Sequence, residues 1–363
     1  MVEGKIKTIV ISHFDSDHWG GLKNLYYKDE FSAYFKTNKV FHNGLFLTKK
    51  GEDEVIGKTI AGAGAEFFED TILDKGGLAA FAEKYGGEKQ TGYTKLMMEI
   101  MKKTPNTDIQ ILSAGSDALN KEITPVDELA MEILAPVLCD VQSKKLLRKF
   151  DGDVGIQKNG HSVVIKIKYK NVTILLPGDI NDEAEAFLLD HYKQKKEIFC
   201  ADVYKVAHHG SSNFADDFAY AVKPFAYVIS SGDNEQHSHP RPDTLGFLGK
   251  AARGSRPLIF CTELARSTKE ELKTPEGLRT KINAALKEYE SARTKEKKDK
   301  LEKLLDKLEK SLNRSISVYG AINLRTDGHK ILFSQKLEAK RGDLEWDIYR
   351  LEPGAGGLVL VRK

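Results

Sequence analysis

The segment from His13 to Gly21 constrains this chain more than any other part of its sequence. Four side chains that can bind a metal ion fall within six residues of it: His13, Asp15, Asp17 and His18. They follow the β-branched stretch Lys5–Ser12, which predicts a strand, and they precede a segment typical of a helix. Such crowding of imidazoles and carboxylates favours a backbone coiled around an ion. The alternative is a surface loop in which one of these side chains caps the helix.

Three later segments repeat this arrangement, in which a short apolar run ends in histidine or aspartate. They are Leu175–Asp179, Val203–Ser212 and Asn234–Pro240. Because separate strands can deliver their carboxyl ends to one end of a sheet, we expect these side chains to share a site. The Gly178-Asp179 pair is weak by itself, since it is also an ordinary turn.

The remaining pattern predicts an α/β protein, with short apolar strands alternating with helices. The strands expected from His161 to Tyr169 and from Val172 to Pro177 are joined by Lys170-Asn171, which predicts a hairpin. Helices are expected over Tyr93–Lys103 and Asp182–His191. The rest of the stretch from 48 to 120 has no role that its residues indicate.

Taken in order, these motifs resemble the metallo-β-lactamase superfamily. The HxHxDH signature of that superfamily is present in the form HxDxDH, with Asp15 in place of the second histidine. The pattern is most similar to the competence-type hydrolase domain of bacterial DNA-uptake channels (ComEC-like) and its soluble relatives. The matching segments are His13–Gly21, Asn159–Ser162, Gly178-Asp179, Lys205–Ser211 and His239-Pro240, followed by the strand pair around Gly320–Gly328. The resemblance implies a four-layer αββα sandwich.

The resemblance also implies a site for two divalent ions, Zn²⁺ or Mn²⁺. His13, Asp15 and His161 would hold one ion, Asp17 and His18 the other, and Asp179 would bridge them. One histidine of the His208-His209 pair would complete the second ion's ligands and the other would face the substrate; the sequence leaves open which. A histidine that only caps a turn is the alternative for His161.

The same resemblance implies hydrolysis by a hydroxide shared between the two ions. The expected catalytic residues are Asp17, His208 and His239, the last as a proton donor on the substrate side. His237 is expected at the surface, and His42, His191 and His329 are expected to be structural. A phosphodiesterase or nuclease is favoured, with Lys205, Arg241 and basic helices receiving phosphate charge. The alternatives are an acyl-type hydrolase of lactams or thioesters, and a catalytic subunit that acts only within a larger assembly.

Domain boundaries follow from the charged segment near the C-terminus. A hydrolase domain is expected over 1–266, a charged helical insertion over 267–314, and strands that complete the hydrolase domain over 315–363. Relatives carry a β-hairpin before the HxDxDH motif, whereas 12 residues precede His13 here. The N-terminal strand is therefore expected to present an open edge, which a partner protein or a second copy of the chain would pair.

The charged segment is either one long helix or a helical hairpin that breaks near Ser291–Thr294. From Lys269 to Arg314 it holds 14 basic and 10 acidic residues, with leucines at helical spacing. A solvated arm is the ordinary interpretation of such a pattern, and a docking arm for a protein partner, a second copy or nucleic acid is the alternative.

Composition sets the broad class. Hydrophobic residues make up 40% of the chain and charged residues 30%, which is typical of an ordered globular protein. No apolar run is long enough to span a bilayer, so no membrane association is expected. The three cysteines are far apart, which favours a reducing, cytoplasmic location.

Overall fold

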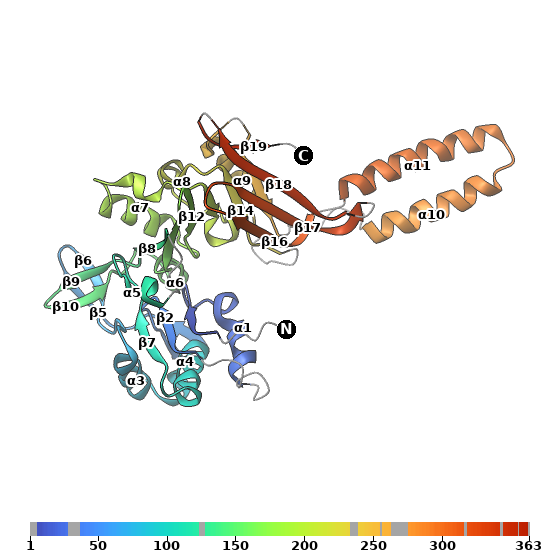
Figure 1. Cartoon of the computed structure of the whole chain (residues 1–363). Helices are drawn as coiled ribbons and strands as arrows, with labels where there is room; N and C mark the ends of the chain where they lie inside the picture. The colour runs from blue at the N-terminus through green and yellow to red at the C-terminus, as the bar shows by residue number, and fades with distance from the viewer. Residues whose placement is uncertain are drawn as a thin grey trace.

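The computed structural model describes residues 6–27, 37–122, 128–232, 239–254, 256–262, 275–315, 318–341, 344–354 and 356–361. Its helices are α1 Ser16–Tyr27, α3 Lys75–Lys84, α4 Gly92–Lys103, α5 Ala118–Glu122, α6 Val154–Gly160, α7 Asp182–His191, α8 Asp216–Val222, α9 Pro242–Ala251, α10 Pro275–Ser291 and α11 Lys295–Ser315. The chain is a mixed α/β protein with several sheets (Figure 1). The α/β class predicted from the sequence is confirmed.

The N-terminal sheet is parallel and has three strands in the order β1-β2-β7. These strands are β1 Thr8–Val10, β2 Lys39–His42 and β7 Asp108–Ile111. Helices α3 and α4 pack on it through a core that includes Val40, Ile109, Leu78 and Leu96. The segment 48–120, to which the sequence assigned no role, thus supplies β7 of this sheet and the two helices that cover it. Within the described residues, β1 pairs only with β2, so its other edge is open.

The larger sheet has six strands in the order β15-β14-β13-β12-β11-β8. They are β8 Leu129–Ala135, β11 Val164–Tyr169, β12 Val172–Leu176, β13 Val203–Lys205, β14 Ala226–Ile229 and β15 Leu258–Cys261. β8, β11 and β12 are antiparallel, whereas β12 to β15 run parallel. The pairing of Tyr169 with Val172 confirms the predicted Lys170-Asn171 hairpin.

Alternate residues of the larger sheet face two different cores. Leu175, Tyr204 and Tyr227 pack against α7, α8 and α9 on one face. The opposite face packs near β8 and β11 against the N-terminal sheet, with Ile133 contacting the core around Phe41. Further along, the same face packs against a C-terminal antiparallel sheet in the order β16-β17-β18-β19. Its strands are β16 Val318–Thr326, β17 Ile331–Arg341, β18 Leu344–Gly354 and β19 Gly357–Val361.

Three two-stranded hairpins complete the sheets. They are β3 Thr48–Lys50 with β4 Asp53–Val55, β5 Thr59–Gly62 with β6 Ala65–Phe68, and β9 Leu138–Val141 with β10 Lys144–Leu147.

Helices α10 and α11 form a helical hairpin that projects away from the sheets (Figure 1). The break near Ser291–Thr294 is one of the two alternatives that the sequence left open. Leu278, Ala285 and Ala292 are buried at seven-residue spacing, which is the seam of a coiled coil. Leu286 and Leu304 are 42% and 43% exposed. No helix in the described part of the chain combines the length and apolar character needed to cross a membrane.

Candidate metal centre

Four side chains from three distant segments meet at the carboxyl ends of the strands. The ligand-capable atoms of Asp17, His18, Asp179 and His209 all lie within 4.8 Å of one another, a group that can hold a metal ion. Asp17 and His18 begin α1, Asp179 follows β12, and His209 follows β13. The side chain of Asp179 is 3% exposed and that of Asp17 is 58% exposed, so the centre opens to solvent at Asp17.

An aromatic contact with α4 fixes the loop that carries the first ligands. The indole Nε1 of Trp19 donates a 2.6 Å hydrogen bond to the backbone oxygen of Phe14. Both rings pack on Tyr93 of α4, with centroid distances of 5.7 Å for Trp19 and 5.8 Å for Phe14. Phe14, Trp19 and Tyr93 are all at most 6% exposed. The His13–His18 loop is therefore anchored in the N-terminal core.

Two serines orient the histidines of this loop. The Ser12 hydroxyl lies 3.0 Å from Nδ1 of His18 and 3.2 Å from Nδ1 of His13. The Ser162 hydroxyl lies 3.2 Å from His13 Nδ1 and accepts the Asp179 backbone N–H at 3.0 Å. Because Nδ1 is engaged in each ring, Nε2 is left to face the centre. His18 Nε2 lies 3.2 Å from Asp179 Oδ2.

Asp179 uses both carboxylate oxygens. Lys205 donates to Oδ1 at 3.0 Å and to the Gly178 backbone oxygen at 3.0 Å, while Oδ2 faces His18 and His209. Gly178 has φ +62°, and a Cβ there would lie 2.7 Å from the Ser162 Cβ, so only glycine fits this turn. Lys205, for which the sequence suggested phosphate binding, is the ammonium partner of Asp179.

The structure distinguishes the two adjacent histidines of the His208-His209 pair. His209 Nε2 lies 3.0 Å from both Asp17 Oδ2 and Asp179 Oδ2, and its Nδ1 lies 2.6 Å from the Ser230 backbone oxygen. His208 turns away: its Nε2 lies 3.4 Å from Asn159, and its ring centroid is 5.5 Å from that of His239. Both residues have positive φ, 44° and 54°, and these left-handed conformations direct the rings apart.

The electrostatics of the group favour a bound cation. The hydrogen bond from His209 lowers the pKa of Asp17 to about 2. Burial would raise the pKa of Asp179, but hydrogen bonds from His18 and His209 and the Lys205 charge hold it well below its usual range. Hydrogen bonds to Asp17 and Asp179 raise the pKa of His209 to about 10. The negative potential that holds this proton is the potential that attracts a metal ion.

His13 and Asp15 lie beside this group without belonging to it. His13 is fully buried, and burial lowers its pKa to about 3. Its Nε2 is buried with no hydrogen-bond partner in the described structure and lies 3.9 Å from Asp15 Oδ2. Asp15 Oδ1 lies 3.0 Å from Lys158 Nζ, and Lys158 also forms an ion pair with Glu54.

The structure places the other predicted ligands differently. His161 packs between Phe150 and Phe68, at ring-centroid distances of 4.8 and 5.8 Å, and hydrogen-bonds to the Arg148 backbone. Burial lowers its pKa to about 3. These are the surroundings of a core histidine, but its Nε2 is buried without a hydrogen-bond partner in the described structure, as that of His13 is, so its role as a ligand stays a prediction. His239 is buried next to His208. His237 lies outside the described residues.

Several residues that support the centre were missed by the sequence analysis. Ser12 and Ser162 flank predicted ligands, and Trp19 directly follows His18, so their proximity was visible. Glu54 and Lys158 are 104 positions apart and belong to no motif, so no local signal joins them.

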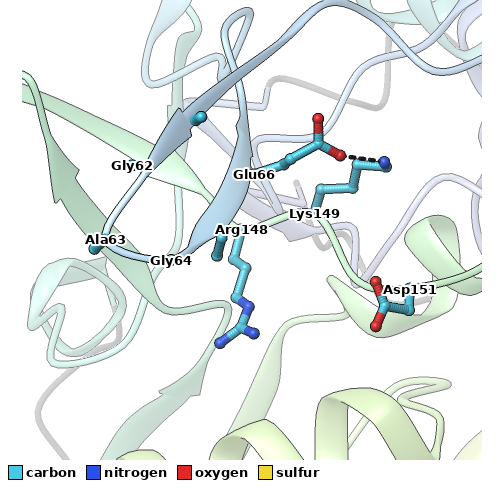
Figure 2. Close-up of a pocket in the computed structure, with 9 residues that line it drawn as sticks. Gly62, Ala63, Gly64, Glu66, Arg148, Lys149 and Asp151 are labelled. Atoms are coloured by element: carbon cyan, nitrogen blue, oxygen red, sulfur yellow. Dashed lines mark hydrogen bonds and ion pairs between the residues drawn. The ribbon is translucent and has the colours of Figure 1, made fainter.

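A hollow of the described surface lies away from this centre. One cavity of about 570 Å³ is lined by the β5–β6 hairpin together with Arg148, Lys149 and Asp151 (Figure 2). Lys149 and Glu66 form an ion pair at its wall, as Figure 2 shows. None of the four clustered ligands lines this cavity.

The chain matches no family model and no curated protein. Interpretation of the centre therefore depends on its motifs and on the geometry just described.

Proposed function

We propose that this protein is a metal-dependent hydrolase of the metallo-β-lactamase type, in its competence-type branch, and that it cleaves phosphodiesters. The observation that carries the proposal is the convergence of Asp17, His18, Asp179 and His209 within 4.8 Å. These residues come from the HxDxDH, Gly-Asp and His-His-Gly-Ser segments, the same segments that support the resemblance. Their meeting in space is what a shared metal centre requires.

The layering of the chain supports an αββα sandwich. Helices α3 and α4 cover the N-terminal sheet, that sheet packs on the six-stranded sheet, and α7, α8 and α9 cover the far face. The C-terminal strands pack on the same face of the six-stranded sheet as the N-terminal sheet does. This supports the proposed division into a hydrolase domain over 1–266 that residues 315–363 complete, interrupted by the arm over 267–314.

The residues present fit divalent ions. Imidazole nitrogens and carboxylate oxygens suit Zn²⁺ and Mn²⁺, and the unpartnered Nε2 of buried His13 is a donor that an ion would satisfy. Asp17, His18, Asp179 and His209 would hold one ion, and His13 with Asp15 would contribute to the second. When bound, two such ions activate water as a nucleophile and stabilise the charge of a phosphodiester undergoing attack.

The protein's own residues would position these groups. Lys205 holds Oδ1 of Asp179, which keeps Oδ2 directed at the histidines. Ser12 and Ser162 hold the imidazole Nδ1 atoms. We assign His208 and His239 to the substrate side, because their ring centroids lie 5.5 Å apart while His209 contacts the carboxylates of Asp17 and Asp179. If His239 donates a proton to the leaving oxygen, the leaving group departs as an alcohol and not as an alkoxide.

An assay against several substrates tests this function. The full chain, supplied with Mn²⁺ or Zn²⁺, is offered single-stranded DNA, duplex DNA, RNA and bis-(p-nitrophenyl) phosphate, with nitrocefin as the acyl substrate. We expect metal-dependent release of nitrophenol or cleaved nucleic acid, which chelation abolishes. If the chain hydrolyses nitrocefin and none of the phosphodiesters, the phosphodiesterase proposal is wrong and the alternative of an acyl hydrolase takes its place.

A second candidate is a catalytic subunit completed by a partner. In the part of the chain that the structure describes, β1 pairs on one side only, which favours it because unpaired backbone groups at a sheet edge invite another strand. Native mass measurement of the full chain after expression distinguishes the two: a monomer that is active by itself contradicts the assembly.

A further inference from the structure

Two lysines contact the metal centre: Lys205 pairs with Asp179 in one half, and Lys158 pairs with Asp15 in the other. The ammonium of Lys158, on α6, lies 3.0 Å from Asp15 Oδ1 and forms a second ion pair with Glu54 of the β3–β4 hairpin. It also lies 5.0 Å from the centroid of the Phe14 ring. The Lys158 side chain is only 18% exposed, so water screens its charge poorly. The ion pairs with Asp15 and Glu54 stabilise the charged form of Lys158.

The two halves of the centre therefore differ before any ion binds. In one half, Asp17, His18 and His209 gather around Oδ2 of Asp179 and face solvent through Asp17. In the other half, His13 is buried and Asp15, the single carboxylate among its proposed ligands, is paired with Lys158; the first half keeps Asp17 beside the Asp179–Lys205 pair. A divalent ion entering that half must share Asp15 with an ammonium that is held in place by Glu54.

The charge balance of the whole centre limits the number of divalent ions that it holds. The charged groups are four carboxylates, Asp15, Asp17, Asp179 and Glu54, and two lysines, Lys158 and Lys205. With the imidazoles neutral, as metal ligands must be, the net charge is −2. One divalent ion balances it. A second leaves an excess of two positive charges in a partly buried site, where charges interact more strongly than in water.

We propose that the centre binds two ions unequally, and that Lys158 is the residue that weakens the ion held by His13 and Asp15. The inference rests on the proposed function, since it concerns the same metal centre. Lys158 acts through Asp15 and is a positioning residue. The second ion thus binds only when its concentration is high, or when an anionic substrate adds negative charge, so occupancy of the centre is coupled to substrate.

Stepwise titration of the metal-free full chain with Mn²⁺ tests this directly. Calorimetry gives the affinity of each step, and elemental analysis counts the ions. The variants are Lys158→Met, which removes the ammonium and keeps an unbranched side chain, Lys158→Arg, which keeps the charge, and Glu54→Gln. Lys149→Met is the matched control, because it breaks a lysine–glutamate pair, with Glu66, that does not touch the ligands. Circular dichroism checks that each variant is folded.

We expect a tight and a weak step, separated by at least about tenfold, in the wild-type chain. Lys158→Met should tighten the weak step by about tenfold or more and leave the tight step unchanged. Lys158→Arg and the control should resemble the wild type. Glu54→Gln should weaken the second step further, because it leaves the ammonium uncompensated.

Equal affinities for the two ions in the wild type would overturn the inference while leaving the proposed function intact. A second step that is unchanged or weaker in Lys158→Met would do the same, because Lys158 would then only orient Asp15. A wild-type chain that binds no Mn²⁺ would overturn the proposed function, and this inference with it.

Discussion

Replacing Trp19 by phenylalanine tests whether the N-terminal core positions the metal ligands. The change removes the 2.6 Å hydrogen bond to the Phe14 backbone oxygen and thins the contact with Tyr93, at a side chain that is 6% exposed. Leaving a buried carbonyl without its donor costs about 1–3 kcal/mol. For a chain of 363 residues this lowers the melting temperature by about 1–4 °C.

The same free energy bounds the effect on metal binding. If Mn²⁺ binding has to supply the whole 1–3 kcal/mol to restore the wild-type conformation of the His13–His18 loop, Mn²⁺ affinity falls by about 5- to 150-fold. Calorimetric Mn²⁺ titration and thermal unfolding measure the two effects on one preparation. The chain has two tryptophans, so Trp346→Phe is the matched control: it makes the same change on β18, away from the ligands.

Trp346→Phe also leaves Trp19 as the sole tryptophan, so its fluorescence should change when Mn²⁺ binds. If Trp19→Phe leaves both the melting temperature and the Mn²⁺ affinity at wild-type values, the loop is not held by this contact and the reasoning is refuted.

Three further outcomes are expected. Asp179→Asn should abolish metal-dependent hydrolysis with the fold retained by circular dichroism, because it removes the carboxylate that faces both histidines; activity above one tenth of wild type would contradict this assignment. His209→Ala should lose bound Mn²⁺ by elemental analysis while His208→Ala keeps it, and the reverse pattern would exchange their roles. Burial raises the pKa of Glu185 well above its usual value, so the folded chain keeps a proton that the unfolded chain releases, and stability falls as pH rises above about 4.5. Glu185→Gln should flatten that decline in urea unfolding between pH 5 and pH 8, whereas exposed Glu183→Gln should not.

Much of the centre could be predicted because its ligands sit at strand ends. Three strands end shortly before a group of ligands: β1 before His13, β12 before Asp179 and β13 before His208-His209. These ligands therefore lie at one end of the fold, whatever the conformation of the loops between them. The helical character of the charged segment could be predicted from its leucines at helical spacing, but the choice between one long helix and a hairpin that breaks near Ser291–Thr294 could not.

The remaining features depend on contacts that leave no local pattern. A histidine near a strand start looks alike in sequence whether it faces a site or the core; Phe68 and Phe150 surround His161 and belong to other segments. Lys205 precedes a histidine pair, which suggested phosphate binding, yet its ammonium reaches back to the neighbouring strand end. Glu54 reaches the centre only through Lys158, by folding of a hairpin whose polar sequence resembles any surface loop.

Diffraction from crystals of the full chain grown with Mn²⁺, recorded at the manganese absorption edge, tests the central claim most directly. Our account predicts an anomalous peak among Asp17, His18, Asp179 and His209, about 2.0–2.3 Å from His209 Nε2 and Asp179 Oδ2. A weaker second peak should lie next to His13 and Asp15. Crystals saturated with Mn²⁺ that show no peak at the four clustered side chains would contradict the claim that this chain carries a metal centre.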